Sequence, residues 1–324
     1  MLISNVLNSQ IKTGGNYNNK VPFCSMYLKT DILEKTNQHK QMLAFDLDGT
    51  FLVGSKKDFD EFNRLYNPDK QKLVFVTGKL IEELQPMLDK YSANGIDFPI
   101  PDYFIANDGQ QIYSITRENN RIKANIDNEW ETKLSTFDVS KVLPSIEKSF
   151  QKDLIGPKPS IIPISYKSSS RLKWFLFNHS MKDTIGEDIK KVLAQNNLQA
   201  EVILDYVLPE DMKKKKNLEQ YSHLLDSNGG CYAFAIAASN KGEAIKFLQQ
   251  KFNIKDSNVI AAGNAQNDIS LSDKGFWFIV VANALEDLKE STLKLGEKLK
   301  KTIIMASKDG LAGINEALKG LLKS

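Results

Sequence analysis

Two aspartates separated by a single residue follow the first strongly apolar run of the chain. The run spans residues 42–46 and ends in Asp46, which is followed by Leu47, Asp48, Gly49 and Thr50. One carboxylate can attack phosphorus and become an acyl phosphate, while the other protonates the leaving oxygen and then activates water. Because two close carboxylates repel each other unless a hard cation neutralises them, the pair also predicts a Mg²⁺ site. Asp and Gly are favoured in plain turns as well, so other motifs must support the chemistry.

Three more polar groups follow apolar runs or begin predicted helices. Thr77 ends a second run and offers a hydroxyl, with backbone amides after it that can hold a phosphate oxygen. Lys241 opens a predicted helix at 241–252 and can place a positive charge over a phosphoryl group. A third run ends before Asn264, and Asp268 with the nearby amides can complete a cation site. A lone threonine is usually a helix cap and a lone lysine is usually solvated, so these groups indicate a phosphate-binding site only when they occur together. As a set they provide the positioning and charge stabilisation that phosphoryl transfer requires.

The elements that must position these groups alternate between apolar runs and amphipathic segments. Strands are predicted at 42–46, 72–78, 103–107, 110–115, 231–237, 258–263, 276–283 and 301–306, with a turn at Asp108 and Gly109. Helices are predicted at 58–66, 80–91 and 241–252, with one from Leu285 and a last one ending near 322. This alternation predicts a Rossmann-like, doubly wound parallel sheet, and ligands of such sheets bind beyond the carboxyl ends of the strands.

The middle of the chain differs in composition and in the pattern of its elements from both ends. From about 116 to 235 it is polar and rich in Lys and Ser, with strands predicted at 171–177 and 200–207 and a helix at 186–196 between them. This β-α-β segment predicts an inserted α+β domain. We therefore expect an N-terminal extension at 1–39, a core domain at 40–115 and 232–324, and a cap domain at 116–231.

Composition argues against several classes of protein and of binding partner. The chain has 324 residues, of which 41% are hydrophobic, and its net charge is only +3, so nothing calls for nucleic acid or an anionic membrane. The lysine run at 213–216 lacks interleaved aromatic residues, which favours a solvated loop over a nucleic-acid patch. Two distant cysteines predict neither a disulfide scaffold nor a structural zinc site. Without a recognisable secretory signal or membrane span we expect a cytoplasmic protein, although export by another signal stays open. The sequence does not define the oligomeric state.

Four segments in this order resemble the motifs of the haloacid dehalogenase superfamily. LAFDLDGT (43–50) resembles motif I, VFVTGK (74–79) motif II, SNKGEAI (239–245) motif III and GNAQNDISL (263–271) motif IV. The insertion falls between motifs II and III, as in the type 2 caps of the superfamily, and its β-α-β content suits subtype C2B. The form of motifs III and IV is similar to the sucrose-phosphatase and Cof-like branches, which are mostly Mg²⁺-dependent sugar-phosphate phosphatases.

The resemblance assigns roles to individual residues. It implies that Asp46 is the nucleophile and Asp48 the general acid and base, while Thr77 and Lys241 hold the transferring phosphate. It implies further substrate contacts and a magnesium site, for which the candidates are Gly49, Gly78, Lys79 and Asn267 for substrate, and Asp46, Asp48, Asn264 and Asp268 for the metal. The chain would then hydrolyse a phosphomonoester of a small metabolite, with a sugar phosphate as the expected substrate.

Motif IV departs from the family pattern at one position. The family usually has GDxxND, whereas this chain has Asn264 in place of the first Asp. An asparagine carbonyl can coordinate Mg²⁺, but the site has one negative charge fewer and should bind the ion more weakly. Two alternatives to hydrolysis therefore stay open: a catalytically weakened binding or regulatory protein, and a phosphotransferase or mutase that passes the phosphoryl group to an alcohol.

Overall fold

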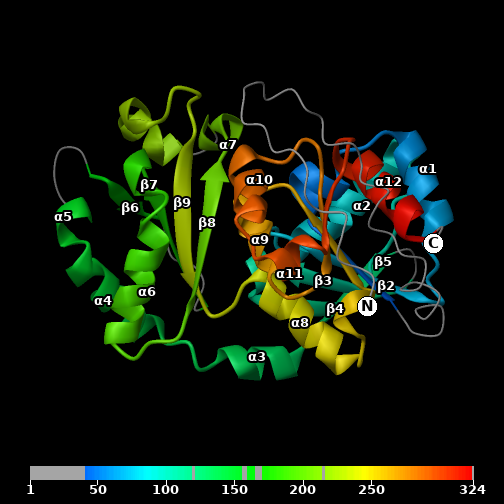
Figure 1. Cartoon of the computed structure of the whole chain (residues 1–324), viewed down its shortest axis with the longest axis horizontal. Helices are drawn as coiled ribbons and strands as arrows, with labels where there is room; N and C mark the ends of the chain where they lie inside the picture. Colours follow the sequence, from blue (N-terminus) through cyan, green and yellow to red (C-terminus); the bar gives the residue numbers. More distant parts are fainter. Residues whose placement is uncertain (1–40, 119–120, 155–158, 165–169, 214–215, 323–324) are drawn as a thin grey trace, which may run out of the picture.

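The chain folds around two separate β-sheets, as a computed structural model shows (Figure 1). The structure describes residues 41–118, 121–154, 159–164, 170–213 and 216–322. One sheet has eight strands in the order β12-β11-β10-β1-β2-β3-β4-β5, and the other has four in the order β6-β7-β9-β8. The predicted α/β class with a parallel-sheet core and an additional α+β unit is confirmed. The predicted extension at 1–39 lies outside the described residues, as do residues 214–215 of the lysine run.

The eight-stranded sheet is parallel from β12 to β3, and β4 and β5 continue it as an antiparallel hairpin. At its centre β1 lies between β2 and β10, with Met42 opposite both Lys72 and Val259. The strands are β1 (Gln41–Phe45), β2 (Gln71–Val76), β3 (Tyr103–Ala106), β4 (Gln111–Glu118), β5 (Arg121–Ile126), β10 (Val259–Gly263), β11 (Trp277–Val280) and β12 (Ile303–Met305). Their carboxyl ends, from β1 to β3 and from β10 to β12, therefore meet at one edge of the sheet.

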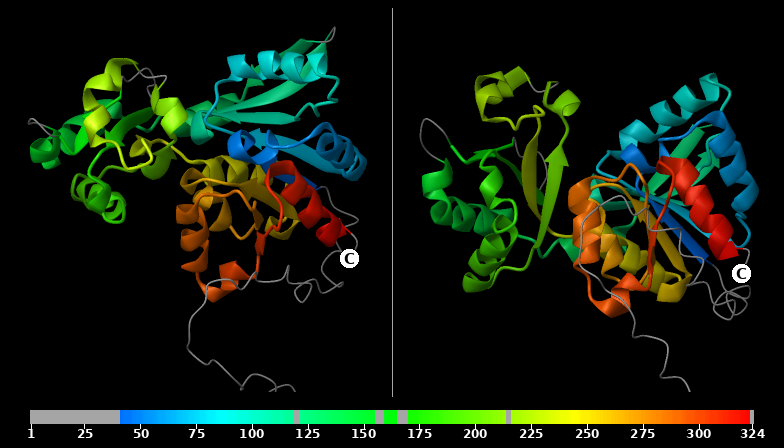
Figure 2. Two further views of the ribbon diagram at one scale, coloured as in Figure 1. Left: turned by 90° about the horizontal axis from the view of Figure 1, so that it is seen from above. Right: turned by 45° about the horizontal axis from the view of Figure 1, so that its top comes forward.

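Helices cover both faces of this sheet (Figures 1 and 2). Strand order runs in opposite directions on the two sides of β1, so right-handed crossovers place the two sets of helices on opposite faces. One set comprises α1 (Lys56–Leu65), α2 (Leu84–Ala93) and α12 (Gly310–Leu322); the other comprises α8 (Lys241–Lys251), α9 (Ile269–Ser272) and α10 (Glu286–Leu293). The remaining helices near this sheet are α3 (Asn128–Leu134) and α11 (Glu297–Lys300).

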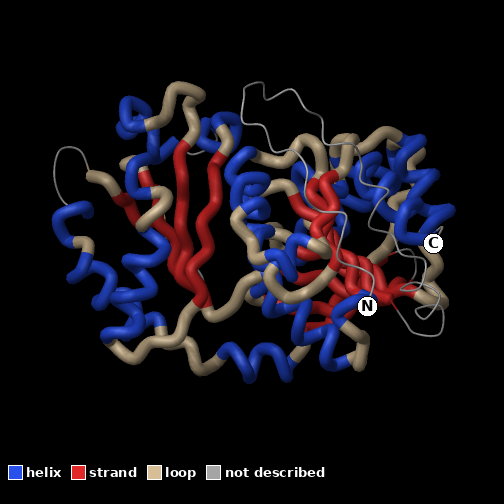
Figure 3. The backbone as a smooth tube through the Cα atoms, in the orientation of Figure 1, coloured by secondary structure: helices blue, strands red, loops and turns tan. Residues whose placement is uncertain are grey.

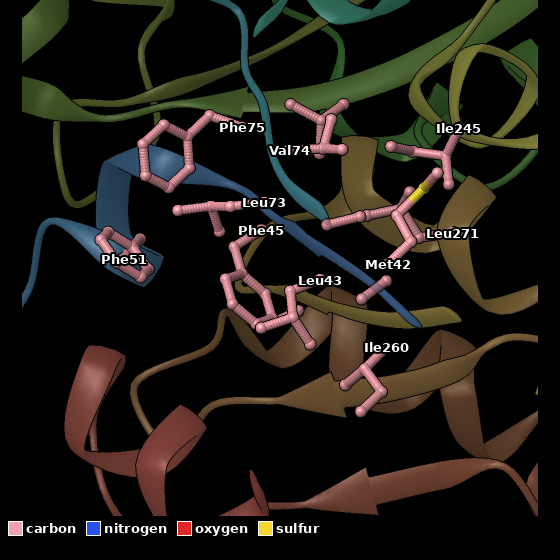
Figure 4. Packing of buried hydrophobic residues seen from close by; sticks show 14 of the residues in the cluster. Met42, Leu43, Phe45, Phe51, Leu73, Val74, Phe75, Ile245, Ile260 and Leu271 are labelled. Atoms are coloured by element: carbon pink, nitrogen blue, oxygen red, sulfur yellow. The ribbon is translucent and has the colours of Figure 1, made fainter. Parts of the chain in front are cut away.

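Alternate residues of β1 pack into these two layers (Figure 4). Phe45 lies beside Phe51, with ring centroids 5.9 Å apart, and Phe51 in turn contacts Phe75 at 4.9 Å. On the opposite face Met42 points toward Ile245 of α8. Because β1 is buried on both faces, its position is fixed, and so is the position of the loop that follows it.

The four-stranded sheet is antiparallel throughout. Its helices within 139–154 and 185–195 cover the face away from the first sheet, and its other face is turned toward that sheet (Figure 3). Trp174 and Phe234 stack at 5.1 Å in the core beneath these helices. The elements are β6 (Ile161–Pro163), β7 (Arg171–Leu176), β8 (Glu201–Val207), β9 (Cys231–Ala237), α4 (Val139–Ser149), α5 (Gln151–Leu154), α6 (Ile185–Gln195) and α7 (Pro209–Lys213).

The strand predicted at 231–237 forms, but its predicted place in the first sheet is wrong. It is β9, which lies between β7 and β8 in the second sheet. Both faces of β9 are covered, so all seven residues are buried and give the continuous apolar run that is typical of a parallel strand. Conversely, β5 at 121–126 extends the first sheet, although these residues were expected in the cap. Since Leu134 packs in the first core and Val142 in the second, we propose cap boundaries near 136 and 238.

Within the described ranges, no helix has the length and apolar character that crossing a membrane requires.

Candidate active site

The site lies at the carboxyl edge of the eight-stranded sheet, where three neighbouring strands end. Asp46 follows β1, Thr77 follows β2 and Asn264 follows β10. The Asp46 amide donates to the carbonyl of Ala262 at 3.1 Å, which continues the ladder between β1 and β10. The sequence therefore placed these three residues correctly at one edge of one sheet.

A sharp turn after Asp46 is fixed by contacts with two other loops. Gly49 has φ +74°, and a Cβ there would lie 2.2 Å from the Asn264 side chain, so glycine is needed for the approach. The Gly49 carbonyl accepts a hydrogen bond from Asn283 Nδ2 at 2.7 Å, and Asn283 Oδ1 accepts from the Gly310 amide at 2.8 Å. The predicted role of Gly49 as a substrate contact thus stays a prediction, while its conformational role is clear.

Lys241 forms the centre of a buried charge cluster. Its Nζ lies 2.8 Å from Asp46 Oδ1 and 2.6 Å from Asp268 Oδ1, and its side chain is only 1% exposed. Asn240 caps α8 by accepting from the Glu243 amide at 2.9 Å, which sets Lys241 as the first residue of the helix. The helix start that the sequence predicted thus places the lysine directly against Asp46, the predicted nucleophile.

Burial and charge act against each other on the pKa values of this cluster. Burial raises the pKa of Asp46 to about 8, because it outweighs the attraction of Lys241. Burial lowers the pKa of Lys241, but the charges of Asp268 and Asp46 raise it by more, so this lysine is protonated at neutral pH. The lysine therefore supplies a permanent positive charge beside Asp46, which favours the ionised form of this carboxyl group and limits the rise in its pKa.

Asp268 is completely buried and holds the motif IV loop together. Its Oδ2 accepts from the amides of Asn264 at 2.9 Å and Ala265 at 3.0 Å, while Oδ1 contacts Lys241. Both oxygens are thus engaged by protein groups. This arrangement gives Asp268 the task of orienting Lys241 and the loop, and its direct ligation of a metal stays a prediction.

Asp48 and Lys79 form a more exposed pair at the edge of the site. Lys79 Nζ lies 2.9 Å from Asp48 Oδ2 and 3.8 Å from Glu83, and the Asp48 side chain is 64% exposed. Thr77 is buried, and its Oγ accepts from the Lys79 amide at 3.2 Å, so its hydroxyl hydrogen can still be donated to a phosphate oxygen. The structure therefore places Lys79, a predicted substrate contact, against the predicted acid and base.

Whether these residues fit a magnesium ion depends on which atom of the Asn264 amide faces the site. One terminal atom of this amide lies 2.8 Å from the Asp48 carbonyl oxygen, 2.9 Å from Thr50 Oγ and 3.3 Å from Asp46 Oδ2. If this atom is oxygen, ligand oxygens converge as Mg²⁺ requires; if it is nitrogen, it donates to all three groups. No cluster of three His, Cys, Asp or Glu side chains suited to a metal exists in the part of the chain that the structure describes. The residues present fit Mg²⁺ only with the Asn264 amide and the Asp48 carbonyl as ligands.

The structure places one further residue in the candidate active site, Asp108, which the sequence analysis interpreted only as part of a turn. Asp108 is buried, and its Oδ1 accepts from Asn267 Nδ2 at 3.1 Å and lies 3.8 Å from Lys241 Nζ. A Cβ on Gly78 would lie 3.4 Å from the same oxygen. Two predicted substrate residues, Gly78 and Asn267, thus lie beside a carboxyl group that was not among the predicted site residues. Its only sequence signal was an Asp at a turn beside the site's sheet edge.

The fold and this site define a phosphatase of the haloacid dehalogenase superfamily. The chain resembles the crystal structure of the sucrose-phosphatase from Synechocystis sp. PCC6803 in complex with sucrose and phosphate, with TM-score 0.63 and 18% identity over 87% of this chain and 98% of that one. It also resembles yhjK, a haloacid dehalogenase-like hydrolase protein from Bacillus subtilis, with TM-score 0.54 and 17% identity over 91% of this chain and 100% of that one. The phosphoglycolate phosphatase of Archaeoglobus fulgidus is 32% identical over 111 residues, which are 34% of this chain and 45% of that protein.

A family model described as sucrose-6F-phosphate phosphohydrolase matches residues 39–320, and the chain belongs to this family. The predicted superfamily, branch and enzyme class are thereby confirmed.

Proposed function

We propose that this chain is a Mg²⁺-dependent phosphomonoesterase that acts on a sugar phosphate through an aspartyl phosphate on Asp46. The observation that carries the proposal is the buried Asp46 carboxylate with Lys241 Nζ at 2.8 Å. The family description and the sucrose-phosphatase neighbour support a sugar phosphate as the substrate.

In this mechanism one carboxylate attacks and the other handles protons. Asp46 Oδ1 contacts Lys241, so Oδ2 is the oxygen placed to attack phosphorus. The new bond from Asp46 to phosphorus forms as the bond from phosphorus to the leaving oxygen breaks, and Asp48 gives its proton to that oxygen. Asp48, now a carboxylate, takes a proton from water, which attacks the same phosphorus and releases phosphate from Asp46.

Lys241 and Thr77 stabilise the phosphoryl group during both steps. The lysine supplies charge and the threonine supplies a hydrogen-bond donor, which together match the equatorial oxygens of the transferring group. A Mg²⁺ ion held by Asp46, the Asp48 carbonyl and Asn264 would supply further neutralisation of negative charge.

A second candidate, binding without turnover, is favoured by Asn264. With its nitrogen turned inward, the amide donates its hydrogens toward the Asp48 carbonyl and Asp46 Oδ2, the oxygens that would otherwise face a cation. In that case the site would accept phosphate ligands but would transfer the phosphoryl group poorly. A phosphotransferase is a third alternative, which differs only in the acceptor of the second step.

The test is phosphate release from p-nitrophenyl phosphate, sucrose 6F-phosphate and other sugar phosphates, with Mg²⁺ varied from micromolar to tens of millimolar. We expect Mg²⁺-dependent turnover that Asp46→Asn abolishes while circular dichroism stays native. Retained turnover in Asp46→Asn would refute the nucleophile assignment. Wild-type phosphate binding without turnover would favour the second candidate, and phosphate transfer to an added sugar would favour the third.

A further inference from the structure

A strained turn between β3 and β4 lies against the residue that precedes the catalytic lysine. Asn107 and Asp108 have φ of +52° and +55°, and Gly109 follows with +102°. A Cβ at position 109 would lie 2.3 Å from the carbonyl oxygen of Asn240. Left-handed backbone in consecutive L residues persists only where the surroundings fix it, which is most common at functional sites.

The turn directs the Asp108 side chain into the site, where it contacts groups from several motifs. Its Oδ1 accepts from Asn267 of motif IV at 3.1 Å and lies 3.8 Å from Lys241 of motif III. Burial raises the pKa of Asp108, but the charges of Arg171, Lys241 and Lys173 outweigh it, so the pKa lies below its ordinary value. Asp108 is therefore a carboxylate at neutral pH.

The strongest partner of this carboxylate comes from the second sheet. Arg171, the first residue of β7, places Nη1 2.8 Å from Asp108 Oδ2 and 2.9 Å from Asn107 Oδ1. Its side chain is only 10% exposed. A charge-assisted contact so well removed from water is held much more firmly than a surface ion pair. Both residues with strained backbone thus contact one cap arginine.

A second route joins the same cap strands to Lys241. Arg171 lies opposite Ala237, the last residue of β9, and the chain then passes through Asn240 into Lys241. Asn240 Nδ2 also donates to Glu201 of β8 at 2.7 Å. Lys241 thus follows the last strand of the cap sheet after only three residues. Its Nζ also lies close to Asp108, which contacts the same cap sheet through Arg171.

We propose that Asp108 is a positioning residue that couples the place of the cap to the catalytic groups: its pair with Arg171 holds Lys241 and Asn267 in their working positions. The proposal rests on the proposed function for its kinetic readout only. It gives Arg171 of the cap a role in positioning the catalytic groups, which it exerts through its contact with Asp108 of the core.

The test compares two variants that each remove one cap cation from a core carboxylate. Arg171→Gln breaks the contact with Asp108. Lys182→Gln, the matched control, breaks the contact of Lys182 with Asp287 of α10, whose atoms lie 3.0 Å apart. Both are measured in the full chain by p-nitrophenyl phosphate kinetics, thermal unfolding, and hydrogen–deuterium exchange of peptides covering 238–248 and 264–272.

We expect Arg171→Gln to lower kcat by about 10- to 100-fold, because small misplacements of catalytic groups have effects of this size. Amide exchange should become faster in both core peptides, and Arg171→Lys should restore most of kcat. Asp108→Asn should behave like Arg171→Gln, and the double variant should be no worse than either single one. Lys182→Gln should change kcat by less than about 3-fold, as expected for a change outside the coupled groups.

Equal effects of Arg171→Gln and Lys182→Gln would overturn the coupling, since general loosening of the cap would then suffice. A lower melting temperature of Arg171→Gln without changes in kcat and in exchange of the two peptides would also overturn it. If the wild type hydrolyses no ester, the proposed function fails, and the exchange data still decide the coupling.

Discussion

Replacing Asn264 by aspartate restores the charge that motif IV lacks, and its effect should depend on the metal. One terminal atom of the amide lies 3.3 Å from Asp46 Oδ2 and 2.8 Å from the Asp48 carbonyl oxygen. A carboxylate oxygen at this point would repel Asp46 by about 5 kcal/mol at an effective dielectric constant of about 20. Where the inward atom of the wild-type amide is nitrogen, the substitution also removes the hydrogen bonds that it donates, each worth about 1 kcal/mol.

Lys241 and proton uptake offset part of this repulsion, so we expect metal-free Asn264→Asp to be less stable than wild type by about 2–4 kcal/mol. At about 2 °C per kcal/mol this lowers the melting temperature by about 4–8 °C in EDTA. With Mg²⁺ the same charge is attractive, and we expect binding about 10- to 100-fold tighter, which is about 1.4–2.8 kcal/mol. Mg²⁺ should therefore raise the melting temperature of the variant much more than that of wild type.

The assays are isothermal titration calorimetry with MgCl₂ and thermal unfolding with and without the metal. Asn94→Asp is the matched control, because it adds the same charge at an exposed residue where α2 ends. The reasoning would be refuted if Asn264→Asp were as stable as wild type in EDTA and bound Mg²⁺ no more tightly.

Three further outcomes follow from the same geometry. Lys241→Met leaves its two buried carboxylate partners without a cation, so chemical denaturation should show a loss of about 3–5 kcal/mol, and phosphate release should stop; a loss below about 1 kcal/mol would contradict this. Because the pKa of Asp108 lies below its ordinary value, its ion pairs stabilise the fold above about pH 4 and are lost as the pH falls further. The difference in unfolding free energy between wild type and Asp108→Asn should therefore shrink below about pH 4 in urea titrations, and a constant difference would contradict the assignment. Gly49→Ala strains a φ of +74° and brings a Cβ against Asn264, so stability should fall by at least about 1 kcal/mol and Mg²⁺ affinity should fall with it; unchanged calorimetric affinity would speak against it.

The groups that the sequence located correctly are those at strand ends. Asp46, Thr77 and Asn264 each follow a buried apolar run, and parallel strands bring such positions to one edge. Lys241 was located by the start of its helix, which Asn240 caps as the local pattern favours. These inferences rest on periodicity and topology, which a sequence displays directly.

The residues that the sequence did not reveal depend on contacts between distant segments. Asp108 was interpreted as a turn residue, and the direction of its side chain depends on an arginine of the second sheet. Arg171 itself lies in a strand whose alternation shows two faces but not what each face meets. The sheet of β9 was misassigned for a related reason, since burial on both faces gives the same apolar run in either sheet.

The central place of β1 has a consequence for folding during synthesis. Met42 pairs on one side with Lys72, which soon follows, but on the other side with Val259, which is made only after the whole cap. Contacts between such distant segments form slowly, because a long loop must close first. The cap sheet needs only residues 161–237 and can pair before then. An emerging chain therefore exposes one edge of its most apolar strand until β10 appears, and this interval is when aggregation or chaperone binding should be greatest.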